Sequence, residues 1–552
     1  MKPKSRGFLS LAEELQSYIL SFLPYQDILR CTSVCKALRQ TYISSSELQY
    51  ITELGGQQLL PVPDTELDNH TSISKRLQLL RDKAHAWFKF DIHSFETVSI
   101  PEQFHDAKTS LADGHLCSFN EDEQSAKIFP ILPKPSQHKI ERDWSPGSLC
   151  SIPNTESIEV FMDPAQNLIA IACIIADETL RTDDKRFCID LGVLDGDGIH
   201  PEAAGKTLFL SRLPKCEDGL YTIENWKLEG FGKHIAFRRS LLVHEGGYKF
   251  GEEIWFLQIW DWKNSTTSNC VLSDTIINPE VGESLDFCFL GNDRLLIVSK
   301  ELKLYSIEDL SQAPQLLACF LMPVSVTGIQ CLLPMDDIAH SSPLQMQAQR
   351  TMWTSDPKNR ILSLITRIHD AWDSFTFVIS TRIFFDPQAG VFEGKAAIPW
   401  QSWGPLNARV FVHHWRSRVG VSGNRVLQAF TATDPTAEED LDDMDYRLYM
   451  MDFSPLAVER RQGLGRVVTE PSVIEITESG ETLTSSLPYV EIVSDRIFSA
   501  EQVTDIWVDK DRIYLPKPNI EDPDSVGSAF STKSDILIFV QDSIGQLEVI
   551  EI

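Results

Sequence analysis

The chain has 552 residues, of which 42% are hydrophobic, 23% are charged and 9% are aromatic. This composition is typical of globular proteins and excludes a chain that is mainly disordered, collagen-like or coiled coil, while the length predicts more than one domain. The formal charge is −29, so the chain would repel a nucleic-acid backbone, and it contains no local basic stripe that would bind one.

Neither a membrane-spanning segment nor a secretory signal is indicated. The longest uninterrupted apolar run, Leu168 to Ala176, is far shorter than the ~20 residues of a membrane-spanning helix. Glu13 and Glu14 interrupt the stretch behind the basic start, where a cleavable signal needs a continuous apolar segment. The eleven cysteines include no C-x-x-C pair, as is typical of reduced thiols. The sequence predicts a protein of the cytoplasm, the nucleus or both, with no membrane partner.

Residues 8–50 have the pattern of a small helical unit. A first helix carries apolar residues spaced 4, 4 and 3 apart on one face, and Pro24 is expected to end it: Leu11, Leu15, Ile19 and Phe22. Asp27 is expected to cap a second helix. That helix is apolar on more than one side, with spacings of 3, 4 and 3 and two further residues elsewhere on its circumference: Ile28, Cys31, Cys35 and Leu38, then Leu29 and Val34.

This helical unit has more apolar surface than it can bury. A segment of roughly 40 residues can barely bury a core of its own, and a leftover apolar patch usually marks a site for a protein partner. Residues 1–60 contain six Lys/Arg and five Asp/Glu, a net charge of +1, which leaves −30 for the remainder. We therefore expect the unit to bind a partner through apolar contacts rather than through charge.

A connecting region is expected to follow. Ser45, Ser46 and Glu47 resemble a helix start, Gly55 and Gly56 a helix end, and residues 60–71 a linker rich in turn formers. A further helix is predicted from apolar residues at spacings of 4, 3, 4 and 3: Ile73, Leu77, Leu80, Ala84 and Trp87. The predicted domains are a helical unit at 8–54, a linker and connecting helix at 55–89, and a β domain at 90–552.

From about residue 90 the apolar pattern has the period of β-strands. The window from Ser284 to Pro323 fits four short strands into about 40 residues, which is the size of one β-propeller blade. The last strands, Ile536 to Val540 and Leu547 to Ile550, suggest that both ends of the region close one ring. A sandwich or barrel would rarely hold about 460 residues of short strands, whereas radial blades absorb that length. The predicted fold is mainly β, with an N-terminal helical domain and a β-propeller-like C-terminal domain.

No catalytic or metal signature withstands inspection. Gly205-Lys206-Thr207 lacks the first glycine of a phosphate-binding loop and precedes a strand-like segment, and Asp195 to Gly198 lacks the next ligand of a calcium loop. The Gly420 to Gly423 segment has the wrong spacing for a hydrolase nucleophile. The 13 histidines form no zinc-binding pattern. The sequence predicts a non-catalytic protein without a cofactor or a metal.

A candidate substrate-binding surface lies in the last third of the chain. Residues 431–552 hold 26 acidic and nine basic residues, net −17, which would attract a basic partner. The candidate residues are an aromatic group and an acidic run: Trp400, Trp403 and Trp415, then Asp440, Asp442, Asp443 and Asp445. The alternatives are core packing for the tryptophans and a solvated loop for the acidic run.

Residues 11–38 resemble an F-box. The resemblance rests on Glu14 and Leu15, on the Phe22-Leu23-Pro24 stop, on Asp27-Ile-Leu-Arg30 and on Val34-Cys35-Lys36. Ala12 stands where the family has proline, and Leu38 stands where tryptophan is usual. The continuation is similar, more loosely, to fungal F-box proteins in which a linker helix leads into a propeller-like region.

This resemblance implies a substrate-receptor subunit of an SCF-type cullin-RING ubiquitin ligase, in the ubiquitin conjugation pathway. The F-box would bind a Skp-family adaptor, which joins it to cullin and RING subunits, while the propeller would bind a protein substrate. By resemblance, ten residues would face the adaptor or support that face: Leu11, Leu15, Ile19, Leu23, Pro24, Ile28, Leu29, Val34, Cys35 and Leu38. Two alternatives remain open, an F-box scaffold that pairs only with the adaptor and a propeller enzyme.

Overall fold

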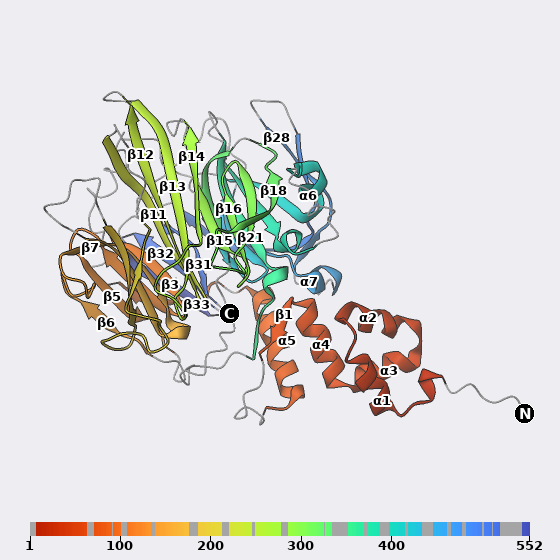
Figure 1. Ribbon diagram of the computed structural model, residues 1–552. Helices are drawn as coiled ribbons and strands as arrows, with labels where there is room; N and C mark the ends of the chain where they lie inside the picture. Colours follow the sequence, from red (N-terminus) through yellow and green to blue (C-terminus); the bar gives the residue numbers. More distant parts are fainter. Residues whose placement is uncertain are drawn as a thin grey trace, which may run out of the picture.

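The computed structural model places a small helical arm beside a large β domain (Figure 1). It describes residues 7–62, 71–90, 92–100, 107–133, 139–175, 186–211, 220–245, 249–277, 285–324, 326–333, 352–368, 374–386, 397–413, 418–432, 445–460, 465–476, 482–499, 502–509, 512–518 and 544–551. The predicted fold class, an N-terminal helical unit followed by a mainly β propeller, is confirmed.

In the described part of the arm, five α-helices follow one 3-10 turn, η1 (Phe8–Ser10). They are α1 (Glu13–Leu20), α2 (Tyr25–Val34), α3 (Lys36–Ser44), α4 (Ser46–Gly56) and α5 (Ile73–Lys89). The predicted helix start at Ser45 to Glu47 and the helix predicted from the spacing of Ile73 to Trp87 are confirmed. The hydroxyls of Ser45 and Ser72 cap α4 and α5, because each accepts a hydrogen bond from a backbone N–H three residues on.

Two predictions about the second helix are wrong. The stretch from Ile28 to Leu38 is not one helix, since Cys35 has an extended backbone, with φ −155° and ψ 163°, and separates α2 from α3. Asp27 is not the cap, because α2 begins at Tyr25 directly behind Pro24. Proline favours a helix start, where its missing N–H leaves no bond unmade. Asp27 instead pairs with Arg30 one turn later.

The β domain is a seven-bladed propeller within the described residues. Blade 1 holds β3 (Lys108–Ala112), β4 (His115–Asn120), β5 (Ser125–Pro130) and β6 (Arg142–Trp144); blade 2 holds β7 (Thr155–Asp163), β8 (Leu168–Ile175), β9 (Arg186–Val193) and β10 (Thr207–Phe209). Blade 3 holds β11 (Leu220–Phe231), β12 (His234–Glu245), β13 (Lys249–Asp261) and β14 (Val271–Ile277); blade 4 holds β15 (Asp286–Phe289), β16 (Arg294–Val298), β17 (Glu301–Ser306) and β18 (Gln315–Leu321).

The remaining blades complete the ring. Blade 5 holds β19 (Val326–Leu332), β21 (Ile361–Ile368), β22 (Ser374–Ser380) and β23 (Ala408–His413); blade 6 holds β24 (Val419–Ser422), β25 (Arg425–Thr431), β26 (Asp445–Asp452), β30 (Tyr489–Ser499) and β27 (Arg466–Val468). Blade 7 holds β31 (Trp507–Asp509), β32 (Arg512–Pro518), β33 (Ile544–Glu551) and β2 (Glu96–Ser99). Every strand pair within the blades is antiparallel, and the four strands predicted between Ser284 and Pro323 are blade 4.

Strands from the two ends of the propeller region meet in blade 7, which confirms the predicted ring closure. Strand β2 pairs with β33, with Glu96 opposite Val549 and Ser99 opposite Gln546. Arg512 then joins blade 7 to blade 1, because its guanidinium donates to the carbonyl oxygens of Ile131, at 3.0 Å, and of Leu132, at 2.8 Å. The predicted strand at 536–540 lies outside the described residues.

The arm is packed directly against the propeller. Strand β1 (Leu59–Pro61) pairs with β20 (Trp353–Ser355), which lies between blade-5 strands in the sequence. Trp87 on α5 is fully buried among residues of blades 6 and 7, and the Arg425 guanidinium lies 4.9 Å from the centre of its ring. Gly56 ends α4 so close to α7 (Pro455–Arg460) that an added Cβ would lie 2.7 Å from Leu456 Cβ. These contacts hold the arm in one orientation.

Ion pairs connect the inner strands of several neighbouring blades. Strands β7 and β11 are in contact, as are β15 and β19, so that the first strands of neighbouring blades lie side by side around the axis. Lys108 Nζ lies 2.8 Å from Glu121 and 3.7 Å from Glu159, which links blades 1 and 2. Lys227 Nζ lies 2.7 Å from Asp286, which links blades 3 and 4.

We expect removal of residues 536–552 to destabilise the whole propeller. The deletion takes away β33, which pairs with both β2 and β32, so it opens the ring and exposes two unpaired strand edges. Thermal unfolding should show a strongly lowered midpoint, whereas a chain lacking residues 1–6, which include no described strand, should melt like the parent. A truncated chain with the parent's midpoint would indicate blades that fold independently.

Glu159 should make the stability of the propeller depend on pH. Burial raises the pKa of this carboxyl to about 7, against the opposing attraction of Lys108. The pKa of Glu159 is higher in the folded protein than in the unfolded chain. The free energy of unfolding therefore falls as the pH rises from about 4.5 to 7, by at most about 3 kcal/mol. Glu159→Gln should therefore stabilise the protein at pH 8 and leave it nearly unchanged at pH 4.5.

Denaturant unfolding at pH 4.5, 6 and 8 measures this difference. Glu156→Gln is the matched control, because Glu156 lies on the same strand with an exposed side chain. Equal pH profiles for the parent and Glu159→Gln would contradict the assignment.

Candidate interaction surface

The first four helices share a small core of their own. Leu20, Ile28, Leu38 and Leu48 are each at most 8% exposed and pack together, one from each of α1 to α4. The half-buried residues around this core are Phe8, Leu23, Cys31, Cys35, Tyr42 and Ile51. This core fixes which face of each helix points outward.

Helix α1 and the residues at its two ends present an apolar face to solvent. We call this face the α1 stripe; its members are Leu11, Leu15, Tyr18, Ile19 and Phe22. Their positions follow the i, i+4, i+7, i+8, i+11 spacing of one helix face. Phe22 is 71% exposed and its ring lies edge-on to that of Tyr18, with ring centres 4.9 Å apart.

The arm exposes an unusual share of the protein's large apolar side chains. Within the described residues, 20 such side chains are exposed, and eight of them lie between Leu9 and Ile43. Single exposed apolar residues are normal on a soluble protein, whereas a concentrated group marks a surface that another molecule covers. The α1 stripe is therefore the candidate binding surface of the arm.

Buried polar contacts hold α1 in place behind this surface. The Gln16 side chain is 7% exposed and donates from Nε2 to the Leu11 carbonyl oxygen at 2.8 Å, while its Oε1 accepts from the Thr41 hydroxyl at 3.4 Å. The Ser44 hydroxyl donates to the Glu13 carboxylate. Because these bonds tie α1 to α3, the stripe is presented on a fixed helix.

The ten residues predicted to form or support the adaptor-binding face differ in their exposure to solvent. Leu11, Leu15, Ile19, Pro24 and Val34 are exposed; Leu23, Leu29 and Cys35 are half-buried; Ile28 and Leu38 are core. Four exposed apolar residues of the arm are absent from that list of ten: Leu9, Tyr18, Phe22 and Ile43. A helical wheel drawn through Leu11 would have found Tyr18, which lies seven residues further on. Whether these residues contact an adaptor stays a prediction.

The comparison with protein families decides what the arm is. The family described as "F-box domain" matches residues 8–41, which span α1 to α3 and end within α3. Residues 8–41 are an F-box domain. Such domains typically occur in non-catalytic subunits that bind Skp-type adaptors, and here the F-box precedes a seven-bladed propeller.

Comparisons with whole proteins add little to this. No curated protein matches the chain. Among solved structures, the WD40 domain of SCAP from fission yeast is 6% identical, with 82% of this chain and 97% of that chain covered and a TM-score of 0.31. The phage phi92 endosialidase is 9% identical, with 83% and 69% covered and a TM-score of 0.28. Likenesses this remote carry no argument about the F-box protein.

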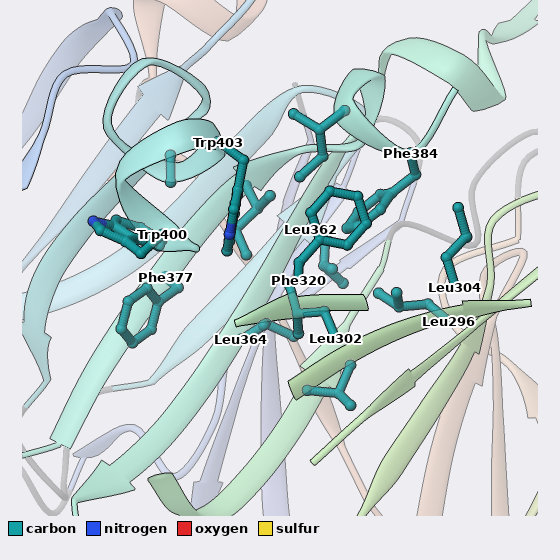
Figure 2. Packing of buried hydrophobic residues seen from close by; sticks show 14 of the residues in the cluster. Leu296, Leu302, Leu304, Phe320, Leu362, Leu364, Phe377, Phe384, Trp400 and Trp403 are labelled. Carbon is teal, nitrogen blue, oxygen red and sulfur yellow. The ribbon is translucent and has the colours of Figure 1, made fainter. Parts of the chain in front are cut away.

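The prediction that Trp400 and Trp403 form a substrate-binding surface is wrong. Both lie on α6 (Trp400–Asn407) and are only 5% and 4% exposed. Figure 2 shows them among the apolar side chains between blades 4 and 5, where Trp400 packs edge-on against Phe377 with ring centres 5.9 Å apart. The indole N–H of Trp403 donates to the Leu321 carbonyl oxygen at 3.2 Å. Buried rings with satisfied polar atoms belong to the core.

The other predicted substrate residues are mostly beyond what the structure describes. Trp415, Asp440, Asp442 and Asp443 lie outside the described residues, whereas Asp445 begins β26 and is exposed. No group of three or more His, Cys, Asp or Glu among the described residues has the geometry of a metal site. None of the described helices combines the length and the apolar character needed to cross a membrane.

Proposed function

We propose that this F-box protein is the substrate-receptor subunit of an SCF-type cullin-RING ubiquitin ligase in the cytoplasm, the nucleus or both. The F-box binds a Skp-family adaptor, and through it cullin and RING subunits, while the propeller binds a protein substrate. The chain contributes no chemistry of its own in this role. It raises the effective concentration of substrate lysines near the conjugating enzyme.

The α1 stripe is the observation that supports adaptor binding most directly. It lies within the matched F-box residues, it is apolar, and the core of the arm is complete without it. Glu13 and Glu14 on the same helix are exposed charges, which suits the polar rim that surrounds apolar interface centres. Adaptor binding through this face should depend little on salt.

The packing of the arm against the propeller supports the second half of the proposal. Helices α4 and α5 join the F-box to blades 6 and 7 through buried contacts at Gly56, Trp87 and Phe90. A substrate on the propeller would then be held at a constant distance from the adaptor. Among the described residues, blade 3 has the longest strands, and Figure 1 shows β12 and β13 reaching away from the arm, where the arm does not obstruct a partner.

Leu15→Asp and Ile19→Asp test adaptor binding. Each change places an unpaired carboxylate in the proposed interface, so we expect a loss of at least about 3 kcal/mol, or roughly 100-fold in affinity. Leu79→Asp is the matched control, because Leu79 is similarly exposed on a helix, at 39%, but lies on α5 outside the F-box. Titration with purified Skp-family adaptor measures the affinity, and circular dichroism verifies folding. Parent-like binding by either F-box variant would refute this interface.

Co-purification of further subunits distinguishes a ligase subunit from a scaffold that binds only the adaptor. A complete ligase should bring cullin and RING subunits down with the parent chain, and the Leu15→Asp variant should lose them together with the adaptor. Recovery of the adaptor without cullin would instead favour an F-box scaffold that pairs with the adaptor only.

We expect the substrate to carry a basic segment. The chain outside residues 1–60 has a net charge of −30, which draws basic polypeptides from a distance and speeds their association, while salt screens the attraction. Replacing Asp440, Asp442, Asp443 and Asp445 by asparagine should reduce the capture of basic interactors several-fold at low salt and have little effect at high salt.

Four exposed acidic residues of other regions provide the control for that experiment. They are replaced by the matching amides: Asp122→Asn, Glu123→Gln, Glu156→Gln and Glu308→Gln. The same interactor set from the parent and from the 440–445 variant at every salt concentration would exclude the acidic run as the contact.

A further inference from the structure

A small cavity lies at the junction of the arm and the propeller. Its volume is about 40 Å³, which is room for about three water molecules or one small ion. Polar groups of both parts of the protein line it, among them Gln57 and Lys83 of the arm and Ser355, Asn424, Arg425 and Ser454 of the propeller. None of the lining residues belongs to the F-box, so the cavity is separate from the α1 stripe.

A tight turn of blade 6 forms one wall of the cavity. Gly423 and Asn424 connect β24 to β25, with Ser422 paired opposite Arg425. Gly423 has a φ of +56°, a backbone conformation that glycine adopts far more readily than other residues. An added Cβ at Gly423 would lie 3.8 Å from Ser355 Oγ. The turn therefore lies against β20, the strand that pairs with β1 of the arm.

Two cationic side chains line the cavity. Arg425 Nε donates to Asp452 Oδ2 at 3.0 Å, while the Ser454 N–H donates to Asp452 Oδ1 at 2.8 Å. Both oxygens of this carboxylate are therefore engaged, and the terminal N–H groups of Arg425 remain for another acceptor. Lys83 forms no ion pair or hydrogen bond with the described residues. Two cations against one carboxylate leave a net charge of +1 at the cavity, on a protein whose formal charge is −29.

Asn424 adds a buried hydrogen-bond acceptor that has no donor. Its side chain is 7% exposed, and its Nδ2 atom donates a long hydrogen bond to the Gln57 carbonyl oxygen at 3.5 Å. Its Oδ1 atom is buried and has no hydrogen-bond partner within the described part of the chain. The Ser355 hydroxyl, on a residue that is 6% exposed, likewise has no partner among the described residues. Because buried polar atoms are normally satisfied by protein, water or a ligand, the cavity has the character of a binding site.

We propose that this cavity binds inorganic phosphate. Lys83, Arg425 and Ser355 donate hydrogen bonds to the phosphate oxygens, as ammonium, guanidinium and hydroxyl groups do at other phosphate sites. Near neutral pH the ion keeps at least one P–OH group, which donates to Asn424 Oδ1. Sulfate has the same shape but carries no proton at this pH, and the phosphate group of phosphoserine has largely lost its proton. Inorganic phosphate is therefore the oxyanion that matches both the donors and the acceptor of the cavity.

A bound phosphate would connect the arm to the propeller. Lys83 lies on α5 of the arm, Ser355 lies on β20, and Arg425 begins β25 of blade 6. A ligand that binds only the folded protein stabilises it as the ligand concentration rises. The junction between the arm and the propeller should therefore be more stable when phosphate is abundant, whether or not an adaptor or a substrate is bound.

Calorimetric titration of the full chain with sodium phosphate at pH 7.5 tests the proposal. We expect one phosphate ion per chain, with sulfate and free phosphoserine binding at least about tenfold more weakly, because neither offers the proton that Asn424 accepts. Phosphate should also raise the midpoint of thermal unfolding more than sodium chloride does at equal ionic strength. No binding of phosphate, or binding of sulfate or phosphoserine as tight as that of phosphate, would overturn the proposal.

Single substitutions locate the site within the protein. Lys83→Gln removes a charged donor and should weaken phosphate binding at least about tenfold, whereas Lys75→Gln, at an exposed position of the same helix outside the cavity, should bind like the parent. Asn424→Ala removes the acceptor, so the preference for phosphate over sulfate should disappear. Circular dichroism verifies folding, and Ser355→Ala, a smaller change that should weaken binding several-fold, serves if Lys83→Gln does not fold. Parent-like affinity in the Lys83 or Ser355 variant, or a parent-like preference in Asn424→Ala, would contradict the assignment.

Discussion

The pairing of β2 with β33 is the contact on which the arrangement of the whole protein depends. Four residues, Glu96 to Ser99, complete blade 7 and close the ring. The same strand follows α5 after only six residues, so ring closure also anchors the end of the helical arm. Trp87, Phe90 and Ile92 are buried in the core of blades 6 and 7 beside that strand. Strand β2 thus both closes the ring and anchors the arm, whereas a flexible linker would have left the arm's position independent of ring closure.

The F-box carries its exposed apolar face because the unit is too small to bury it. Four core residues, one from each of α1 to α4, use the inward faces of the helices. The outward face of α1 then has no partner within the described chain, and the buried bonds of Gln16 prevent α1 from turning that face inward. An apolar surface on a fixed helix costs little to cover, because a partner need not order it first.

In the propeller, charged side chains on the inner strands are paired with charges of opposite sign. Lys227 Nζ lies 2.7 Å from Asp286 and 3.3 Å from Glu229. The pKa values of Lys227 and Glu229 are both raised, for Lys227 because the neighbouring carboxylates outweigh burial, and for Glu229 mainly because of burial. Removing one partner of such a pair leaves an uncompensated charge, which is far more costly than the pair itself. The inner strands therefore depend on one another across blade boundaries.

The sequence by itself determined the elements whose signals are local. Spacing, capping residues and a short motif predicted the helix start at Ser45 to Glu47, the helix from Ile73 to Trp87, the four strands of blade 4 and the F-box resemblance at residues 11–38. The same local reasoning failed at Cys35, where an apolar spacing compatible with one continuous helix contains an extended residue. Spacing cannot reveal a break that the packing of α2 and α3 against α4 imposes.

Only the tertiary structure decided which apolar residues face solvent and which charged groups meet. Trp400 and Trp403 stand beside turn residues in the sequence, yet α6 turns both into the core between blades 4 and 5. Blade stacking brings Lys227 to Asp286, and ring closure brings β2 to β33. The physical reason is that the sequence of a strand predicts which residues lie on each of its two faces, whereas the neighbouring blade determines what each face contacts.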